Sequence, residues 1–359
     1  MYSVMPNKFL VPVSDAEEAI LFTKKEKLHE YAYSGLRKKH KNRKHSVIGV
    51  SLPTQREERW VRDKEVMEAY AKDKGITLKI EIADFDSTKQ ASQVEKLISQ
   101  GIDVLIIAPV NPFTAAVLAE KAHKAGIRVV SYDSLIVNSD LDMYVAFDRR
   151  KVGELQGKYL VTKVPRGNYI IMSGDPGTLF KEGAMEYIEP LVSIGNINIV
   201  TDKMVKGWDP KNAYNIVKES LITANNKVDA VLAPNDATAG AAIEALQEQG
   251  LAGKVAVTGQ DADLAAIQRI IQGTQSMTVF KDTRELARRA MEVASKLSAG
   301  EPVYADTKVN NGKMDVPSIL ISPEPIDKNN IDSVLIESGY LKKEDVYKIR
   351  YRKGNYRSL

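Results

Sequence analysis

The chain has 359 residues, of which 43% are hydrophobic and 27% are charged. This composition is typical of a globular protein, and the length allows two domains. The complete lack of cysteine excludes disulfides and thiolate metal sites, and a net charge of +4 is too small to indicate a nucleic-acid partner.

Neither a membrane span nor a secretory signal is predicted within the sequence. No run of about 18 apolar residues is present, and residues 1–10 have no continuous apolar core. The sequence leaves open whether a signal or anchor segment precedes Met1.

Residues 1–45 are predicted to form an N-terminal helical and basic arm. Ser14 or Asp15 begins a helix with an apolar stripe that continues to about Leu36, and six Lys or Arg residues crowd positions 37–44. Three interpretations stay open: a solvated extension, a surface that pairs with another helix, or a segment attracted to anionic lipid at a membrane surface.

From residue 46 onward, short apolar strands alternate with helices of about 10 to 18 residues. This rhythm runs once to about residue 147 and starts again at 148, which predicts an α/β fold of two doubly wound parallel-sheet domains joined by hinge strands. We expect one lobe at 46–147 plus 281–305. The other lobe, with the C-terminal tail, is expected at 148–280 plus 306–359.

Signatures of common enzymes and cofactor sites are missing from the sequence. No G-x-G-x-x-G opens a helix after a strand, no P-loop is present, and no G-x-S-x-G elbow occurs. The segment Asp261-Ala262-Asp263 lacks the spaced ligands of a calcium loop. We therefore expect a protein that is not an enzyme and that needs neither a cofactor nor a metal.

Polar and aromatic residues follow most of the predicted strands, at the edge of a parallel sheet where ligands bind. They are Arg59-Trp60, Tyr132-Asp133-Ser134, Phe147-Asp148-Arg149, Lys181, Trp208, Asn235-Asp236, Gly259-Gln260-Asp261 and Lys281.

Asn235 and Asp236 admit two interpretations, because either a ligand contact or a cap of the following helix suits them. Trp208, Asp261 and Lys281 follow other strands of the same predicted sheet and should converge on the same cleft. We therefore assign ligand contact to Asn235, and helix capping or loop fixing to Asp236.

This set of residues fits a sugar. Carboxylates and amides bind neighbouring hydroxyls in pairs, and Lys and Arg add charged donors that compensate the carboxylates in a closed cleft. Tryptophan covers the apolar face of a pyranose ring. The chain has two tryptophans, Trp60 and Trp208, one in each predicted domain; the alternative is that both anchor the core.

Several blocks between residues 47 and 333 resemble the type I periplasmic sugar-binding proteins, and within them the members that bind D-xylose. The resemblance implies two α/β domains that are joined by three crossing strands and close on a pentose by hinge motion. The blocks are Glu58-Arg59-Trp60, 152–156, Gly207-Trp208, 235–240, 259–263, 273–275 and 328–332.

The resemblance also implies a set of sugar contacts. Trp60 and Trp208 would stack on the ring, and Lys181 matches a basic position that contacts sugar in related members. Hydroxyl-binding groups would be Arg59, Asp133, Asn235, Asp261 and Lys281, with Asp148 close to the hinge.

The sequence departs from the D-xylose pattern at two places. That pattern has an arginine after the aspartate of the fourth strand, where this chain has Ser134, and the loop 174–177 is shorter. Despite these two departures, the resemblance as a whole favours D-xylose among the pentoses.

Such a protein would be extracytoplasmic and membrane-associated, and would present its closed form to a membrane partner. The N-terminal arm favours the sensor domain of a membrane histidine kinase as this partner; the alternative is an ABC permease. A sugar-responsive transcription repressor has the same core fold, but residues 1–45 offer one helix in place of a helix-turn-helix, so no nucleic-acid partner is expected.

Overall fold

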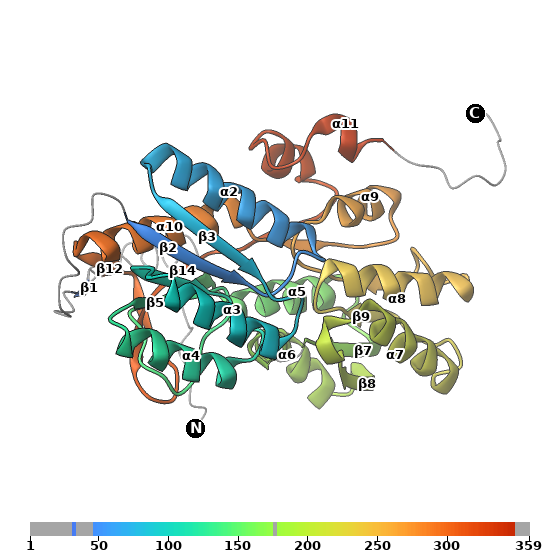
Figure 1. Cartoon of the computed structure of the whole chain (residues 1–359). Coiled ribbons are helices and arrows are strands. Elements are labelled where there is room, and N and C mark those ends of the chain that lie inside the picture. Colours follow the sequence, from blue (N-terminus) through green and yellow to red (C-terminus); the bar gives the residue numbers. More distant parts are fainter. Residues whose placement is uncertain (1–30, 34–45, 175–177, 349–359) are drawn as a thin grey trace, which may run out of the picture.

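The computed structural model describes residues 31–33, 46–174 and 178–348. Two lobes lie side by side, and each has a sheet of mainly parallel strands that is covered by helices on both faces (Figure 1). The predicted α/β fold of two doubly wound domains is confirmed. Within the described residues, the helices are all too short or too polar to cross a membrane.

The first lobe is built on a seven-stranded sheet whose central strands are buried. Its strands are β2 (Val47–Leu52), β3 (Thr77–Ile82), β4 (Val104–Ile107), β5 (Arg128–Tyr132), β6 (Met143–Phe147), β13 (Thr307–Asn310) and β14 (Asp315–Ile321). Their order is β13-β14-β6-β5-β4-β2-β3, and only β13 runs antiparallel to its neighbour. All four residues of β4 are buried, because helices cover both of its faces.

Helices α2 (Glu58–Lys74) and α10 (Thr283–Ala299) pack on one face of this sheet. Helices α3 (Ser87–Ser99) and α4 (Pro112–Lys124) pack on the other face. The beginning of α3 is fixed by Asp86 and that of α4 by Asn111, since each side chain accepts two backbone N–H groups of the first turn.

The second lobe repeats this layered design with a smaller sheet. Its parallel strands β7 (Gly167–Ser173), β8 (Ile197–Met204), β9 (Ala230–Leu232) and β10 (Ala256–Val257) follow the order β10-β9-β7-β8. Helices α5 (Arg149–Lys163) and α6 (Thr178–Ser193) cover one face. Helices α7 (Pro210–Thr223) and α8 (Asp236–Glu248) cover the other.

The chain passes between the lobes three times, and the third passage corrects a predicted boundary. The crossings lie between β6 and α5, between β11 (Thr278–Phe280) and α10, and between β14 and β15 (Glu324–Ile326). Residues 306–321 were expected in the second lobe, but β14 pairs in parallel with β6 of the first sheet. The expectation was wrong because an apolar strand does not reveal from sequence alone which sheet it joins.

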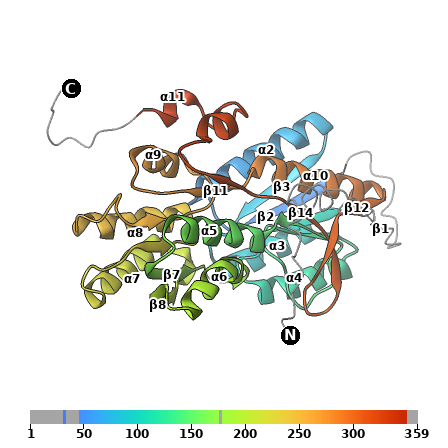
Figure 2. The ribbon, with the colours of Figure 1, turned by 180° about the vertical axis from the view of Figure 1, so that it is seen from behind.

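The C-terminal segment packs on the second lobe and also reaches the first. Two short helices of this segment are η2 (Asp332–Ile336) and α11 (Lys343–Val346). They form a small apolar core with α9 (Leu264–Gln272). Figures 1 and 2 both show this segment beside α2 and α9.

Tyr340 of this segment contacts both lobes. Arg62 of α2 donates a hydrogen bond to the Tyr340 hydroxyl, and its guanidinium carbon lies 4.1 Å from the ring centroid. Arg284 of α10 lies over the same ring at 5.0 Å. On the second-lobe side, Phe280 meets Tyr340 edge-on with centroids 4.6 Å apart.

Most of the predicted N-terminal arm lies outside the described residues. The exception is the short strand β1 (Tyr31–Tyr33), which pairs antiparallel with β12 (Val303–Ala305) of the first lobe. The predicted helix is therefore wrong at these three residues, because their backbone groups pair with a neighbouring strand and not along a helix.

We predict that Tyr340→Ala lowers the free energy of unfolding by about 3 to 5 kcal/mol, because it removes a buried ring from contacts with both lobes. Tyr340→Phe should lose only about 1 kcal/mol, since the ring contacts stay and the hydrogen bond to Arg62 is lost. Urea denaturation measures both changes.

Tyr347 is the matched control, because it is an exposed tyrosine of the same segment. Its replacement by alanine should change the unfolding free energy by less than about 1 kcal/mol. A Tyr340→Ala cost no larger than that of Tyr347→Ala would contradict the assigned role.

Candidate functional site

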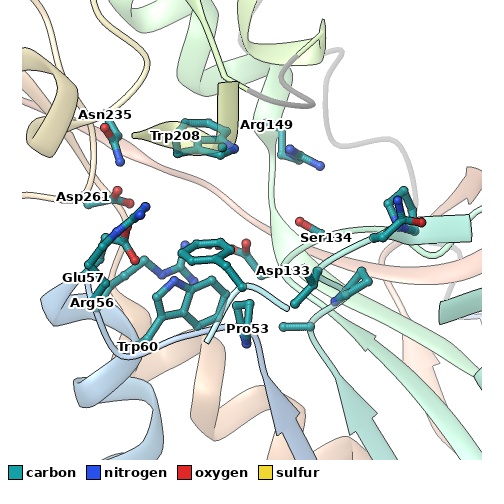
Figure 3. Close-up of a pocket in the computed structure, with 18 of the residues that line it drawn as sticks. Pro53, Arg56, Glu57, Trp60, Asp133, Ser134, Arg149, Trp208, Asn235 and Asp261 are labelled. Atoms are coloured by element: carbon teal, nitrogen blue, oxygen red, sulfur yellow. Dashed lines mark hydrogen bonds and ion pairs between the residues drawn. The ribbon is translucent and has the colours of Figure 1, made fainter. Parts of the chain in front are cut away.

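A cavity of about 530 Å³ lies between the lobes, where the carboxyl ends of both sets of parallel strands meet (Figure 3). This volume is within the usual range for a small-molecule site. Seven of the nine predicted site residues line it: Arg59, Trp60, Asp133, Trp208, Asn235, Asp261 and Lys281.

The first-lobe wall contains a buried network of charges around Arg59. Its Nη1 lies 2.9 Å from Asp133 Oδ1, and its Nη2 lies 3.4 Å from Asp63 Oδ2. Burial alone would raise the pKa of Asp133, but the charges of Arg59, Lys281 and Arg149 outweigh burial and hold this pKa below its ordinary value. Asp133 is therefore a charged acceptor at neutral pH.

Trp60 lies beside this network in the first turn of α2. The Arg59 guanidinium carbon lies 4.2 Å from the Trp60 ring centroid, and Tyr132 packs on it at a tilt with centroids 6.4 Å apart. These contacts hold the indole in place while it lines the cavity.

Trp208 faces Trp60 from the second lobe, across the cavity (Figure 3). Phe180 meets the Trp208 ring edge-on with centroids 6.1 Å apart. A Cβ atom on Gly174 would lie 2.0 Å from the ring, so the indole packs directly on the backbone there. Only glycine at position 174 leaves room for this placement of Trp208.

Asn235 combines a structural role with its position in the cavity. Its Oδ1 accepts hydrogen bonds from the backbone N and the hydroxyl of Thr238, which makes Asn235 the N-cap of α8. Of the two roles expected for Asp236, helix capping is therefore wrong, and loop fixing agrees with its hydrogen bonds to Asp263, Gln275 and Thr278. Because Oδ1 is engaged, the Nδ2 amide is the group of Asn235 that remains to meet a ligand.

Asp261 and Lys281 form a second buried pair in the cavity wall. Lys281 Nζ lies 2.7 Å from Asp261 Oδ1, and both side chains are almost fully buried. The pair places an acceptor and a charged donor next to each other, close to Asn235.

Four non-glycine residues lining the cavity have left-handed backbone conformations. The φ angles are 59° at Phe85, 60° at Asp133, 54° at Trp208 and 100° at Asp261. Such angles are uncommon outside glycine and cost most for a bulky residue such as tryptophan. Backbone strain of this kind clusters at functional sites.

Two predicted residues lie outside the cavity. Asp148 is the N-cap of α5, where its Oδ1 accepts the backbone N–H of Lys151. Lys181 Nζ binds the Asp202 carboxylate at 2.6 and 2.7 Å. Each polar group is occupied by a local partner, which the sequence did not reveal.

Other residues line the cavity that were not among the predicted contacts. Arg149, the neighbour of Asp148, is one, and Phe180 on α6 is another. Ser134, where the D-xylose pattern has an arginine, also lines it. The signal for Arg149 was present, since it follows a strand at a crossing, but the prediction fell on its neighbour.

Asp236 and Asp263 lie behind this wall in a second layer. Asp236 accepts hydrogen bonds from the Gln275 amide, the Thr278 hydroxyl and the backbone N of Asp263. The buried Oδ1 of Asp263 has no hydrogen-bond partner among the described residues. Burial, and then the charges of Asp236 and Asp261, raise the pKa of Asp263. Burial also raises the pKa of Asp236, to about 7. Because three donors hold the Asp236 carboxylate and Asp263 Oδ1 has no partner among the described residues, we assign the proton of the pair to Asp263.

The arrangement suits a small, neutral, polyhydroxylated ring. It offers paired donors and acceptors for hydroxyls and an aromatic surface on two sides. Within the described part of the chain, no group of three or more His, Asp or Glu side chains could hold a metal ion.

Comparisons with known proteins agree with this geometry. The sequence pattern of the periplasmic binding protein domain matches residues 48–302. The chain is 45% identical to the D-xylose-binding periplasmic protein of Escherichia coli and 44% identical to that of Haemophilus influenzae. These matches cover 83% and 84% of this chain, respectively, and 92% of each relative.

A solved structure is also similar. It is a carbohydrate transporter solute binding protein from Chloroflexus aurantiacus in complex with D-glucose, with a TM-score of 0.78 and 35% identity. The match covers 83% of this chain and 97% of that one.

We predict that Asp263→Asn stabilises the fold increasingly as the pH rises. Because the folded pKa of Asp263 lies above the unfolded value of about 3.9, the native state keeps a proton that the unfolded chain has released. Wild-type stability therefore falls as the pH rises through this window, whereas asparagine does not titrate. Between pH 5 and pH 9 the variant should gain at least about 1.4 kcal/mol relative to wild type, which corresponds to one pKa unit.

Urea denaturation at both pH values measures this gain. Asp236→Asn is the contrasting variant: it replaces an acceptor of three hydrogen bonds and should destabilise the fold at both pH values. An advantage of Asp263→Asn that stays constant or shrinks from pH 5 to pH 9 would show that Asp263 does not hold the proton.

Proposed function

The chain belongs to the periplasmic binding protein domain family, and on this premise we propose that it binds D-xylose or a closely similar pentose between its lobes. The observation that carries the proposal is the pair of tryptophans, one on each lobe, that face each other across the cavity. The ion pairs Arg59–Asp133 and Lys281–Asp261 lie beside them as fixed donors and acceptors.

The choice of D-xylose is supported by the identity to two D-xylose-binding proteins. D-Glucose is the main competing ligand, because a similar solute binding protein was solved with it. Binding would proceed without catalysis and outside the cytoplasm, as the periplasmic relatives indicate. The three crossings between the lobes would serve as the hinge.

Delivery of the sugar to an ABC permease is the output that the carbohydrate transporter relative supports. A second candidate is sensory input to a membrane histidine kinase. One observation favours it: residues 1–45, with their basic run at 37–44, precede the family match that begins at residue 48. The basic run would also suit contact with an anionic membrane surface.

We predict that titration calorimetry detects tighter binding of D-xylose than of D-ribose or D-glucose. Trp60→Ala and Trp208→Ala should each weaken D-xylose binding at least about tenfold, or 1.4 kcal/mol, because each removes the cover of one ring face. Tyr347→Ala is the control and should bind normally, because Tyr347 is an exposed aromatic residue that does not line the cavity.

Equal affinity for all three sugars would refute the assignment of D-xylose. Normal binding by both tryptophan variants would refute the stacking arrangement instead. Thermal melting of each variant separates lost contacts from lost folding.

We predict that deletion of residues 1–45 leaves sugar affinity unchanged and abolishes binding to the sensor domain of a histidine kinase from the same cell. The deletion removes the basic run and β1, which pairs only with β12 at the edge of the first lobe. A shorter deletion of residues 1–30 keeps both and serves as the control in the same pull-down. Undiminished binding to the sensor domain after the longer deletion would show that residues 1–45 do not dock it, and no binding by the full chain would favour delivery to a permease.

A further inference from the structure

Arg149 is a cavity residue that the second lobe holds firmly. It is the first residue of α5, and its guanidinium carbon lies 4.8 Å from the ring centroid of Phe180 on α6. Phe180 in turn meets Trp208 edge-on. The Phe180 ring thus contacts both the Arg149 guanidinium, a charged donor, and the Trp208 indole, an aromatic surface of the cavity.

Close packing of α5 against α6 fixes this placement. A Cβ atom on Gly153 would lie 1.8 Å from the carbonyl oxygen of Phe180, and one on Gly183 would lie 2.1 Å from that of Arg150. The backbones approach so closely that the beginning of α5 cannot shift relative to Phe180. Arg149 is therefore positioned by rigid helices and not by a loop.

The Arg149 guanidinium also acts on the first lobe. Its charge is among those that lower the pKa of Asp133, and a hydrogen bond links it to Tyr144. The Tyr144 hydroxyl donates to the backbone carbonyl of Asp133 at 3.0 Å. Ser134, the next residue, has a short side chain that leaves this corner of the cavity open.

We propose that Arg149 is a specificity-determining residue, whose guanidinium donates to the ligand hydroxyl at the corner formed by Asp133 and Ser134. The inference rests on the proposed sugar-binding function. Arg59 and Lys281 are buried in ion pairs with Asp133 and Asp261 and present fixed charges to any ligand. Arg149 is half-buried at the cavity edge. A sugar that places no hydroxyl opposite its guanidinium loses this hydrogen bond and therefore binds more weakly.

The test is calorimetry of Arg149→Met against D-xylose, D-ribose, D-lyxose and L-arabinose. The last three sugars each invert one hydroxyl of D-xylose, at C3, C2 and C4 respectively. Methionine keeps an apolar stem against Phe180 and removes the donors. We expect D-xylose binding to weaken about tenfold to a hundredfold, which corresponds to 1.4 to 2.8 kcal/mol. The affinity for at least one epimer should fall much less, so that the ratio of the D-xylose affinity to the affinity for that epimer decreases strongly.

Arg150→Met is the matched control, because the adjacent arginine pairs with Glu182 and Glu186 on the surface. It should leave all four affinities and their ratios unchanged. Arg149→Lys, which keeps the charge but not the planar donor fork, should give intermediate ratios and covers the case in which the methionine variant folds poorly.

If Arg149→Met lowers the affinity for all four sugars equally, or lowers none of them, Arg149 has no role in specificity. Failure of the proposed sugar-binding function gives a different result, because the wild-type chain itself would then bind none of the four sugars. That result would also refute the role of Arg149.

Discussion

The ion pair between Arg59 and Asp133 is the interaction on which the cavity depends. Removing two charges from water is costly, and close pairing offsets this cost only where the geometry is good. Here α2 supplies Arg59, the end of β5 supplies Asp133, and the two atoms lie 2.9 Å apart. Trp60 packs against the same guanidinium, so one buried charge organises both the polar and the aromatic part of the first-lobe wall.

The second lobe combines a buried ion pair with close backbone packing to the same end. Its wall depends on backbone placement: Trp208 adopts a left-handed conformation and lies directly on Gly174, while Asp261, also left-handed, lies next to Lys281. Side chains fixed in this way lose little freedom when a ligand arrives, which favours affinity. The groups of each wall are therefore held by contacts around the cavity, and hinge motion of the kind proposed would be left to the three crossings.

Much of this organisation was predictable from the sequence, because the loops that leave parallel strands at their carboxyl ends gather at one edge of the sheet. The residues that this rule correctly assigned to one cavity are Arg59, Trp60, Asp133, Trp208, Asn235, Asp261 and Lys281.

The failures have physical causes that the sequence does not show. Asp148 and Arg149 are adjacent, and only the geometry of the first turn of α5 decides that one caps the helix and the other lines the cavity. Lys181 has the right chemistry, yet a neighbouring strand offers Asp202 as a closer partner. Likewise, the sequence of β14 does not show that β6 is its neighbour. Local helix geometry decided the first case, and pairing partners that lie further away in the sequence decided the other two.

The facing tryptophans also determine how this protein can be observed. Because the chain contains two tryptophans and both line the cavity, all of its indole fluorescence originates from the site itself. The two emitters differ in surroundings: Trp60 lies under a guanidinium, while Trp208 lies against Phe180 and the Gly174 backbone. An unlabelled sample thus carries one optical probe in each lobe, and removing either indole isolates the signal of the other.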